Sequence, residues 1–260
     1  APGCNSASVA QYLQSSLILL QQLKGVKLSE ATIGIIGVGN VGSKIAKVAQ
    51  EFGMRVLLND LPREDKEGEK DFCALQTLAE ECDILTFHVP LYKEGKYKTF
   101  HLADNAFFQS LRRKPVIINT SRGEVIETNA LLEALATGII SDAIIDVWEN
   151  EPNINLTLLN KVFLGTPHIA GYSADGKANA TRMSLDALCR HFNLQADYRI
   201  IPPEPEQAQL TTSSMEEAYL KMYDPRRDSE ALKAHPELFE KLRGDYPLRR
   251  EKNAYTILCP

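Results

Sequence analysis

Three polar side chains that each follow a strand-like apolar run have the types needed to oxidise a hydroxy acid. They are Arg122, Glu151 and His168. An arginine can hold a carboxylate with two parallel hydrogen bonds and polarise the adjacent oxygen. A histidine can take the hydroxyl proton as a hydride leaves, and a carboxylate beside the imidazole would orient it and stabilise its protonated form. Residues at the carboxyl ends of parallel strands meet at one edge of the sheet, so we expect these three to share a site.

Each of these residues also has a less specific interpretation. A single arginine after a strand is more often a surface ion-pair partner, as Arg122 could be. His168 could be a buried, hydrogen-bonded histidine and Glu151 an ordinary turn residue, while Asp146 could simply cap a turn. His88, which also follows a strand-like run, is a second candidate base. Composition and spacing alone do not choose between the two histidines.

The stretch of residues 32–60 predicts a dinucleotide site. Gly37, Gly39 and Gly42 form the pattern G-x-G-x-x-G between an apolar run and a segment of helical spacing, and Asp60 ends the next apolar run. The first glycine permits a tight turn, the second lets a pyrophosphate approach the backbone, and the third allows close packing of helix on strand. The glycines could also serve an ordinary turn, but this context makes the pattern strong support for a dinucleotide.

The expected cofactor is NAD rather than NADP. The helix that begins near Asn40 and Val41 offers unpaired N–H groups and the positive end of its dipole to a pyrophosphate. The Asp60 carboxylate can accept hydrogen bonds from ribose hydroxyls and would repel a 2′-phosphate. Arg63 lies close enough in the sequence to weaken that preference. The hydride chemistry itself belongs to the cofactor.

The composition is that of a globular protein without a nucleic-acid role. The chain has 260 residues, 44% hydrophobic and 24% charged, with a net charge of −5. This charge gives no electrostatic reason to bind nucleic acid. The five scattered cysteines suit free thiols in a reducing cytosol, and neither they nor the five histidines have metal-ligand spacing. With no visible leader or membrane-length apolar run, we expect a cytoplasmic protein that binds neither a membrane nor a metal.

Apolar runs of strand character alternate with segments of helical periodicity along most of the chain. The expected strands are residues 33–36, 55–58, 84–87, 115–119, 142–147 and 162–164. The expected helices are residues 8–24, 41–52, 72–82, 103–111, 128–136 with Thr128 as its cap, and 173–195. Residues 62–71 are highly charged, and we expect them to form an exposed loop. The alternation predicts an α/β fold, a Rossmann-type doubly wound parallel sheet with helices on both faces.

A proline-rich segment, residues 201–205, divides the chain. Residues 1–201 are expected to form an NAD-binding domain, and residues 202–260 a small α+β domain with helices around 215–222 and 236–243. This tail is short for an independently stable domain, so we expect it to need a partner surface.

Four motifs together resemble those of the D-isomer-specific 2-hydroxyacid dehydrogenases. They are the glycine-rich turn 37–42, Asn119 to Gly123, Asp146 to Pro152, and Pro167 to Gly171. The resemblance, which covers essentially the whole chain, implies that Arg122 is the substrate-binding catalytic arginine, His168 the proton donor and Glu151 its acidic partner. It also implies cofactor contacts from Gly37, Gly39, Asn40, Val41, Gly42, Asp60, His88, Val89, Thr120, Ser121, Asp146 and Gly171.

Within this family the chain is most similar to the branch that oxidises 4-phospho-D-erythronate with NAD in vitamin B6 biosynthesis. The likeness lies in residues 1–5, 86–93 and 168–172 and in the tail. It implies a substrate contact from Tyr172 and a homodimer formed through the tail. Val89 stands where a threonine can occur, so only a backbone contact with the cofactor is expected there. His88 is then a pocket residue rather than the base.

Two other functions remain open. One is the oxidation of another D-2-hydroxy acid, such as glycerate or 3-phosphoglycerate, and the other is a non-catalytic NAD-sensing module. The family resemblance also places residues 1–24 at the helix that joins a substrate domain to the nucleotide domain. The chain would then begin after most of the substrate domain, and we expect it to bind NAD but to turn over little substrate alone.

Overall fold

Six parallel strands form the sheet that the apolar runs predicted. The computed structural model describes residues 1–195 and 197–259, without the side chain of Glu69. The strands are β1 (Thr32–Ile36), β2 (Arg55–Asn59), β3 (Ile84–Phe87), β4 (Val116–Asn119), β5 (Asp142–Ile145) and β6 (Leu164–Gly165), in the order β2-β1-β3-β4-β5-β6. This confirms the predicted doubly wound α/β fold. The strand order reverses beside β1, and the carboxyl ends of β1 and β3 flank the crevice where such sheets bind ligands.

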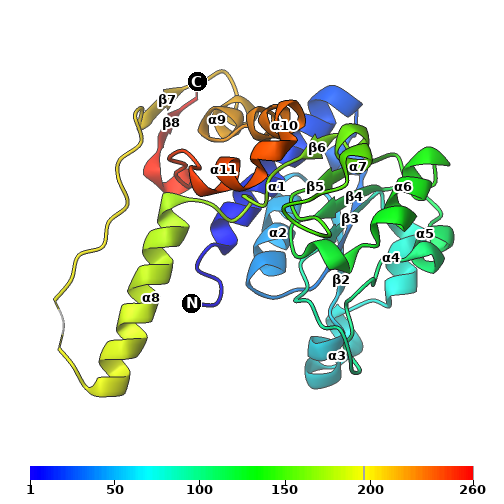
Figure 1. The fold of residues 1–260 in the computed structure, drawn as a ribbon, viewed down its shortest axis with the longest axis horizontal. Coiled ribbons are helices and arrows are strands. Elements are labelled where there is room, and N and C mark those ends of the chain that lie inside the picture. The colour runs from blue at the N-terminus through cyan, green and yellow to red at the C-terminus, as the bar shows by residue number, and fades with distance from the viewer. Residues whose placement is uncertain (196, 260) are drawn as a thin grey trace.

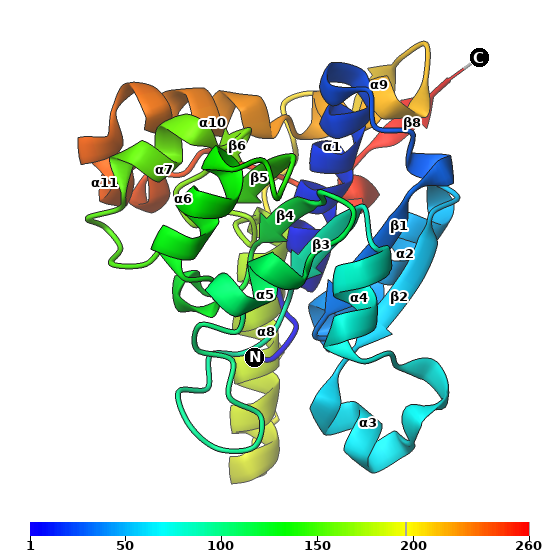
Figure 2. The same cartoon turned by 90° about the vertical axis from the view of Figure 1, so that its right-hand side faces the viewer.

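Helices cover both faces of this sheet. They are α1 (Ser6–Lys24), α2 (Asn40–Glu51), α4 (Leu75–Glu81), α5 (Asn105–Ser110), α6 (Thr128–Ala136) and α7 (Leu156–Lys161). In Figure 1, α1 and α2 lie to the left of the strands and α4, α5 and α6 to the right. Figure 2 shows the latter three in front of the strands. Single 3-10 turns occur at Leu28–Glu30, Glu69–Asp71, Gly123–Val125, Pro236–Leu238 and Lys252–Ala254.

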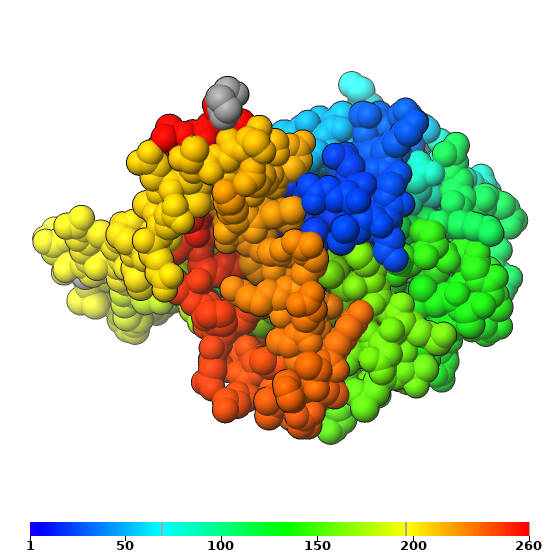
Figure 3. Space-filling view, turned by 90° about the horizontal axis from the view of Figure 1, so that it is seen from above, coloured from blue at the N-terminus to red at the C-terminus, as the bar shows by residue number. Residues whose placement is uncertain are grey.

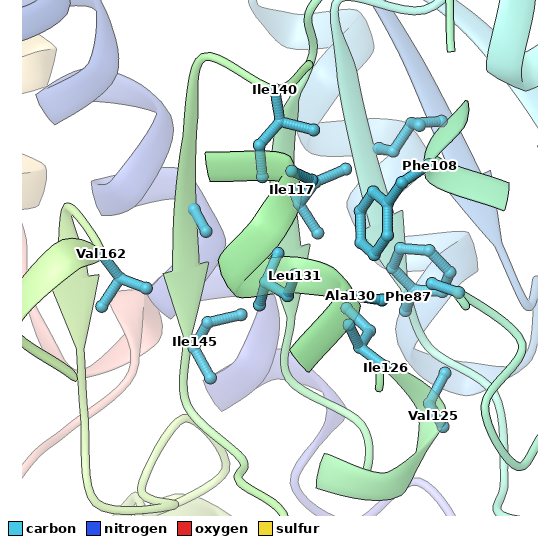
Figure 4. Packing of buried hydrophobic residues seen from close by; sticks show 14 of the residues in the cluster. Phe87, Phe108, Ile117, Val125, Ile126, Ala130, Leu131, Ile140, Ile145 and Val162 are labelled. Atoms are coloured by element: carbon cyan, nitrogen blue, oxygen red, sulfur yellow. The ribbon is translucent and has the colours of Figure 1, made fainter. Parts of the chain in front are cut away.

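Strand side chains alternate between two buried clusters, one on each face of the sheet. Phe87 and Ile145 point into the cluster that Phe108 and Leu131 complete from α5 and α6, as Figure 4 shows. The cluster on the opposite face joins β1, β3, β4 and β5 to Leu13 of α1 and to residues of α2. Burial on both faces explains why these strands read as continuous apolar runs.

The prediction of an exposed loop at residues 62–71 was wrong, because the structure has helix α3 (Leu61–Glu67) there. Asp60 caps this helix by accepting the N–H of Arg63, and Pro62 occupies the first turn, where its missing donor costs nothing. Arg63 and Glu67 then pair one helical turn apart. The cap, with a small contribution from the charge pair, stabilises this helix, which has no buried residue, so apolar periodicity could not reveal it.

Thr128 begins α6 as expected, but it does not cap it. The cap position is Glu127, whose side chain makes no capping hydrogen bond. The backbone N–H of Thr128 is instead accepted by the carboxylate of Glu149, at 2.8 Å. The hydrogen-bond acceptor at the start of α6 is therefore the carboxylate of Glu149, from a distant part of the chain, and not the hydroxyl of Thr128 as expected.

The last helix of the sheet region, α8 (Ala174–Phe192), is shorter than the predicted 173–195 and projects from the body of the molecule (Figure 1). Ser173 caps its start, and Asn193 ends it in the left-handed conformation with φ of 50°. Most of its large apolar side chains are exposed, including Leu188 at 47% and Phe192 at 60%.

The C-terminal segment packs against the nucleotide-binding region. It contains β7 (Gln209–Thr211) and β8 (Thr256–Leu258), which pair in parallel, and α9 (Met215–Met222), α10 (Pro225–Ala234) and α11 (Phe239–Gly244). Helix α10 was not predicted. Tyr223 joins the cluster around α1, while Leu232 and Phe239 enter the cluster on the other face of the sheet. Figure 3 shows the orange part of this segment side by side with the blue N-terminal segment.

Candidate active site

The glycine-rich turn between β1 and α2 has the shape that a pyrophosphate site requires. Gly37 has φ of 90°, and a Cβ there would lie 2.6 Å from the carbonyl oxygen of His88. A Cβ at Gly42 would lie 2.0 Å from the carbonyl oxygen of Gly37. At Gly39 a Cβ would meet nothing within 4 Å, so this glycine faces open space at the start of the twelve-residue helix α2. The turn is thus closely packed against the protein at Gly37 and Gly42 and open to solvent at Gly39, which fits the binding of a dinucleotide.

A cavity of about 430 Å³ opens beside this turn, between the end of β2 and residues 88–102. Gly37, Gly39 and Asp60 line it together with apolar side chains, as expected for the adenosine half of NAD. The Asp60 carboxylate accepts the N–H of Val38 at 2.8 Å and that of Arg63 at 3.1 Å. It therefore fixes the glycine-rich turn as well as the start of α3.

A second cavity, of about 260 Å³, brings together the residues proposed for substrate chemistry. Its lining includes the predicted residues Val41, His88, Val89, Thr120, Ser121, Arg122, Asp146, His168, Gly171 and Tyr172. His88, Val89 and Pro90 line both cavities, so the two adjoin. Asn40, Gly42 and Glu151 do not line either one, although Glu151 reaches the smaller cavity through His168.

His168 and Glu151 form the pair that the sequence suggested. His168 Nδ1 lies 2.8 Å from Glu151 Oε2, and the other carboxylate oxygen accepts the backbone N–H of Trp148 at 2.8 Å. A carboxylate accepts hydrogen bonds and does not donate them, so Nδ1 carries a proton. Nε2 is then the ring nitrogen left to exchange a proton with a substrate.

Asp146 holds the backbone that carries His168. Its carboxylate accepts the N–H groups of Ile169 at 2.8 Å and Ala170 at 2.9 Å and the hydroxyl of Thr166 at 2.6 Å. Burial raises the pKa of Asp146, while His168 and these hydrogen bonds act in the opposite direction. His168 has φ of 56°, a strained conformation for a residue with a Cβ, and the bonds around it maintain that conformation.

His88 is a neutral pocket residue in this structure. Its Nε2 lies 2.8 Å from the hydroxyl of Thr86 and its Nδ1 3.3 Å from the hydroxyl of Thr120. Burial lowers the pKa of His88 to about 3. The partners of His88 are two hydroxyls and no carboxylate, so His88 is poorly suited to accept a proton. His168, in contrast, is paired with a carboxylate.

Arg122 is exposed at the rim of the smaller cavity. Among the residues that the structure describes, no carboxylate lies within salt-bridge distance of its guanidinium, so it is not a surface ion-pair partner. Asn119 positions it by donating to the Arg122 carbonyl at 2.9 Å. A Cβ at Gly123 would lie 2.0 Å from the carbonyl of Trp148, so only glycine lets the arginine loop lie against the loop of Glu151.

Tyr172, at the wall of the same cavity, lies among cations and another aromatic ring. Lys177 Nζ lies 5.3 Å and Arg243 Cζ 5.8 Å from the centre of its ring. Tyr246 packs edge-on against it, with the ring centres 5.9 Å apart. Arg243 and Tyr246 come from the C-terminal segment, which therefore contributes to the surroundings of the site.

Several residues of the site were not predicted. Asn5, Val9 and Pro90 line the smaller cavity, and Asn119 and Thr166 position its loops. Asn119 could have been found, because an asparagine at a strand end often binds the backbone of the following turn. Within the described ranges no three His, Cys, Asp or Glu residues are grouped as metal ligands, and no described helix is long and apolar enough to span a membrane.

The chain is similar to curated dehydrogenases along nearly its whole length. Residues 7–170 match the D-isomer specific 2-hydroxyacid dehydrogenase, NAD binding domain, and residues 204–260 match a domain of unknown function. A Bacteroides thetaiotaomicron protein named erythronate-4-phosphate dehydrogenase is 72% identical over 258 residues, which cover 99% of this chain and 74% of that protein. An Escherichia coli protein of the same name is 41% identical over 270 residues, covering 100% of this chain and 71% of that one.

Solved structures agree with these matches. D-lactate dehydrogenase from Aquifex aeolicus, complexed with NAD and lactic acid, is 26% identical, with a TM-score of 0.63 over 74% of this chain and 68% of that one. The holo form of Rhodotorula graminis D-mandelate dehydrogenase, 24% identical with a TM-score of 0.65, shares the fold over 78% of this chain and 68% of its own. The sequence matches and the geometry of the glycine-rich turn confirm the predicted family and cofactor: the chain belongs to the D-isomer specific 2-hydroxyacid dehydrogenase family and carries its NAD-binding domain.

Proposed function

We propose that this protein oxidises 4-phospho-D-erythronate to (R)-3-hydroxy-2-oxo-4-phosphooxybutanoate with NAD, a reaction of vitamin B6 biosynthesis. The observation that carries the proposal is the pairing of Glu151 with His168, which lines a cavity that also holds the cation of Arg122. This cavity adjoins the one beside the glycine-rich turn. The substrate is inferred from the names of the relatives, of which one is 72% identical to this chain.

In this mechanism Arg122 binds the substrate carboxylate and polarises the oxygen on the neighbouring carbon. The C2 hydroxyl gives its proton to Nε2 of His168 while C2 loses a hydride, so that a C=O double bond forms at C2. Glu151 holds Nδ1–H and stabilises the imidazolium that results. Bound NAD would supply the hydride acceptor, held by the glycine-rich turn and Asp60. In the reverse reaction His168 returns the proton to the oxygen.

The cations around Tyr172 support a phosphorylated substrate. Lys177 and Arg243 lie near its ring, and Tyr172 lines the cavity that contains Arg122. A substrate that carries a carboxylate at one end and a phosphate at the other requires positive charge at two separate places. Arg122 would serve the carboxylate, while Lys177 and Arg243 would lower the cost of placing a phosphate near Tyr172.

We also propose that the protein is a cytoplasmic homodimer that assembles through residues 202–260. Leu248 and Leu258 in this segment are exposed by 50% and 44%. The two-stranded sheet of β7 and β8 also leaves strand edges available for pairing with a second copy. Sedimentation equilibrium tests the assembly, and a monomer at micromolar concentration would contradict it.

His168→Ala tests the assignment of the base. In the full-length protein, this variant should lose turnover of 4-phosphoerythronate by at least about 100-fold, the usual contribution of a general base, while the affinity for NADH stays close to that of the unmodified protein. Full activity in the variant would remove His168 from this role. Faster turnover of glycerate or 3-phosphoglycerate than of 4-phosphoerythronate would contradict the substrate, and NADH binding without turnover of any hydroxy acid would favour a sensing module.

A further inference from the structure

Arg63 stands beside Asp60, the acid that would face the adenosine ribose of bound NAD, yet all three of its guanidinium nitrogens are engaged elsewhere. Nε and Nη2 bind the two carboxylate oxygens of Glu67, at 2.9 and 2.7 Å. Nη1 binds the carbonyl oxygen of Val38 in the glycine-rich turn, at 2.8 Å. The guanidinium also lies over Phe72, with Cζ 5.2 Å from the ring centre. These contacts fix both the position and the direction of the side chain.

The placement of Arg63 matters because of the ligand that this end of the groove receives. The backbone N–H of Arg63 binds the Asp60 carboxylate, so the two residues are neighbours in space. A dinucleotide whose ribose faces Asp60 would bring its 2′ position to the same place. An arginine with free donors there is well suited to bind a 2′-phosphate, since its planar fork matches phosphate oxygens. Such an arginine would work against the repulsion that Asp60 exerts on NADP.

We propose that Glu67 is a specificity-determining residue, which excludes NADP by occupying the guanidinium of Arg63 and holding it away from the 2′ position. Asp60 then repels the 2′-phosphate, and the pair of Arg63 with Glu67 removes a cation that could otherwise attract it. The sequence alone left the influence of Arg63 open, and the bidentate contact with Glu67 resolves it in favour of NAD.

The energetics of this pair favour a role in selectivity over a role in stability. The side chains of Arg63 and Glu67 are 39% and 44% exposed, and exposed pairs of this kind add little to folding. The hydrogen bond with Glu67 raises the pKa of Arg63, and the same contact lowers the pKa of Glu67. Both partners therefore stay charged over the whole physiological range. Removing the carboxylate should leave the fold intact and release a cation.

A double-mutant cycle measures this effect without any turnover. The dissociation constants of NADH and NADPH are determined by fluorescence titration for the unmodified protein, Glu67→Gln, Arg63→Met and the double variant. The ratio of the NADPH constant to the NADH constant should fall about tenfold in Glu67→Gln, as expected for one charge-assisted hydrogen bond at a half-exposed site. The same Glu67→Gln change should leave the ratio unaltered when Arg63 is already methionine. The gain should also shrink in high salt.

The Arg63→Met background is the matched control, because it contains the same loss of negative charge without the cation. An equal fall of the ratio in both backgrounds would show a general charge effect and overturn the proposal. No fall in either background would overturn it as well. NADH binding and the thermal midpoint are measured for each variant to identify any variant that has failed to fold. If Glu67→Gln fails to fold, Glu67→Asp replaces it, because aspartate keeps the charge but is too short for the same contact with Arg63. Because no hydroxy acid takes part, the outcome is independent of the proposed substrate.

Discussion

The substitution Glu151→Gln keeps the size of the side chain that pairs with His168 but changes its charge and its hydrogen bonding. Glutamine has the size of glutamate, but it presents one acceptor and one donor where glutamate presents two acceptors. In the structure one carboxylate oxygen accepts the N–H of Trp148 and the other faces Nδ1 of His168, each at 2.8 Å. The glutamine oxygen can serve only one of these partners. Its amide nitrogen must then face the other.

The two orientations of this glutamine differ in cost. If its oxygen stays with Trp148, the NH2 group faces Nδ1 of His168, which must become an acceptor, and the ring proton moves to Nε2. That tautomer cannot take a proton from the substrate. The opposite orientation keeps the productive tautomer but leaves the Trp148 N–H against a donor, which costs about 1–3 kcal/mol. The productive orientation is therefore populated at roughly 0.5–20%.

The charge of Glu151 contributes a second loss. A hydrogen bond to a charged group contributes about 1.5–3 kcal/mol. Because the imidazolium forms in the transition state, losing this contribution should lower the rate by roughly 10- to 100-fold. Combined with the orientation effect, kcat/KM of the full-length protein for 4-phosphoerythronate should fall by about 10²–10⁴-fold. The affinity for NADH should change little, because Glu151 does not line either cavity.

Glu149→Gln is the matched control on the same loop. Glu149 lies 2.7 Å from Nε2 of His101 and accepts the N–H of Thr128 at 2.8 Å, so it has the same two kinds of partner. It does not line the smaller cavity. Steady-state kinetics and thermal unfolding of both variants separate catalysis from stability. If Glu151→Gln kept more than about one-tenth of the activity, or if the control lost as much, the tautomer argument would fail.

Three further predictions concern other parts of the site. Gly123→Ala places a Cβ 2.0 Å from the carbonyl of Trp148, and the forced backbone shift should cost about 3 kcal/mol and lower the thermal midpoint by about 10 °C, measured by calorimetry. Burial lowers the pKa of His88 to about 3 in the folded state, so the unfolded state binds more protons between about pH 3 and 6.5 and stability should rise with pH across that window. His88→Asn should flatten this slope in urea titrations by up to about 1.4 kcal/mol per pH unit, and an unchanged slope would contradict the assignment. Arg243→Met removes a cation beside Tyr172 and should raise KM for 4-phosphoerythronate about tenfold without a matching change for erythronate, whereas equal changes for both substrates would exclude phosphate recognition.

The sheet could be predicted because its strands are buried on both faces and read as continuous apolar runs. Helices α3 and α10 could not be found by the same means. Helix α3 depends on the cap from Asp60, and α10, whose sequence is mainly polar and charged, begins with a cap from Asp224 and buries only Leu232 among its large apolar side chains. The stability of α3 comes mainly from its cap, and that of α10 from its cap and from tertiary packing; apolar periodicity records neither.

The residues proposed to be catalytic could be named from strand ends and motifs, but their arrangement could not be predicted. Glu151 and His168 are separated by 17 positions in the sequence, and their 2.8 Å contact depends on how two loops fold toward each other. The protonated nitrogen of His168 follows only from that contact. The same is true of Arg63, because its bidentate contact with Glu67, on which the proposed exclusion of NADP rests, is not visible in the sequence.

The loop that carries His168 is fixed from three directions, and this explains how a strained backbone can persist there. Asp146 binds its N–H groups from the sheet side, and from α1 the hydroxyl of Ser8 donates to the carbonyl of Ala170 at 3.0 Å. The C-terminal segment adds Arg249, a buried arginine that donates to the carbonyl of Ile169 at 3.3 Å and also to that of Ser8. A left-handed residue with a Cβ costs about 1–2 kcal/mol and is kept only when its surroundings over-determine it. The C-terminal segment therefore helps to hold His168, the proposed proton-transfer residue, in place. Substitutions of Arg249 should lower the rate of turnover even though this residue lines neither cavity.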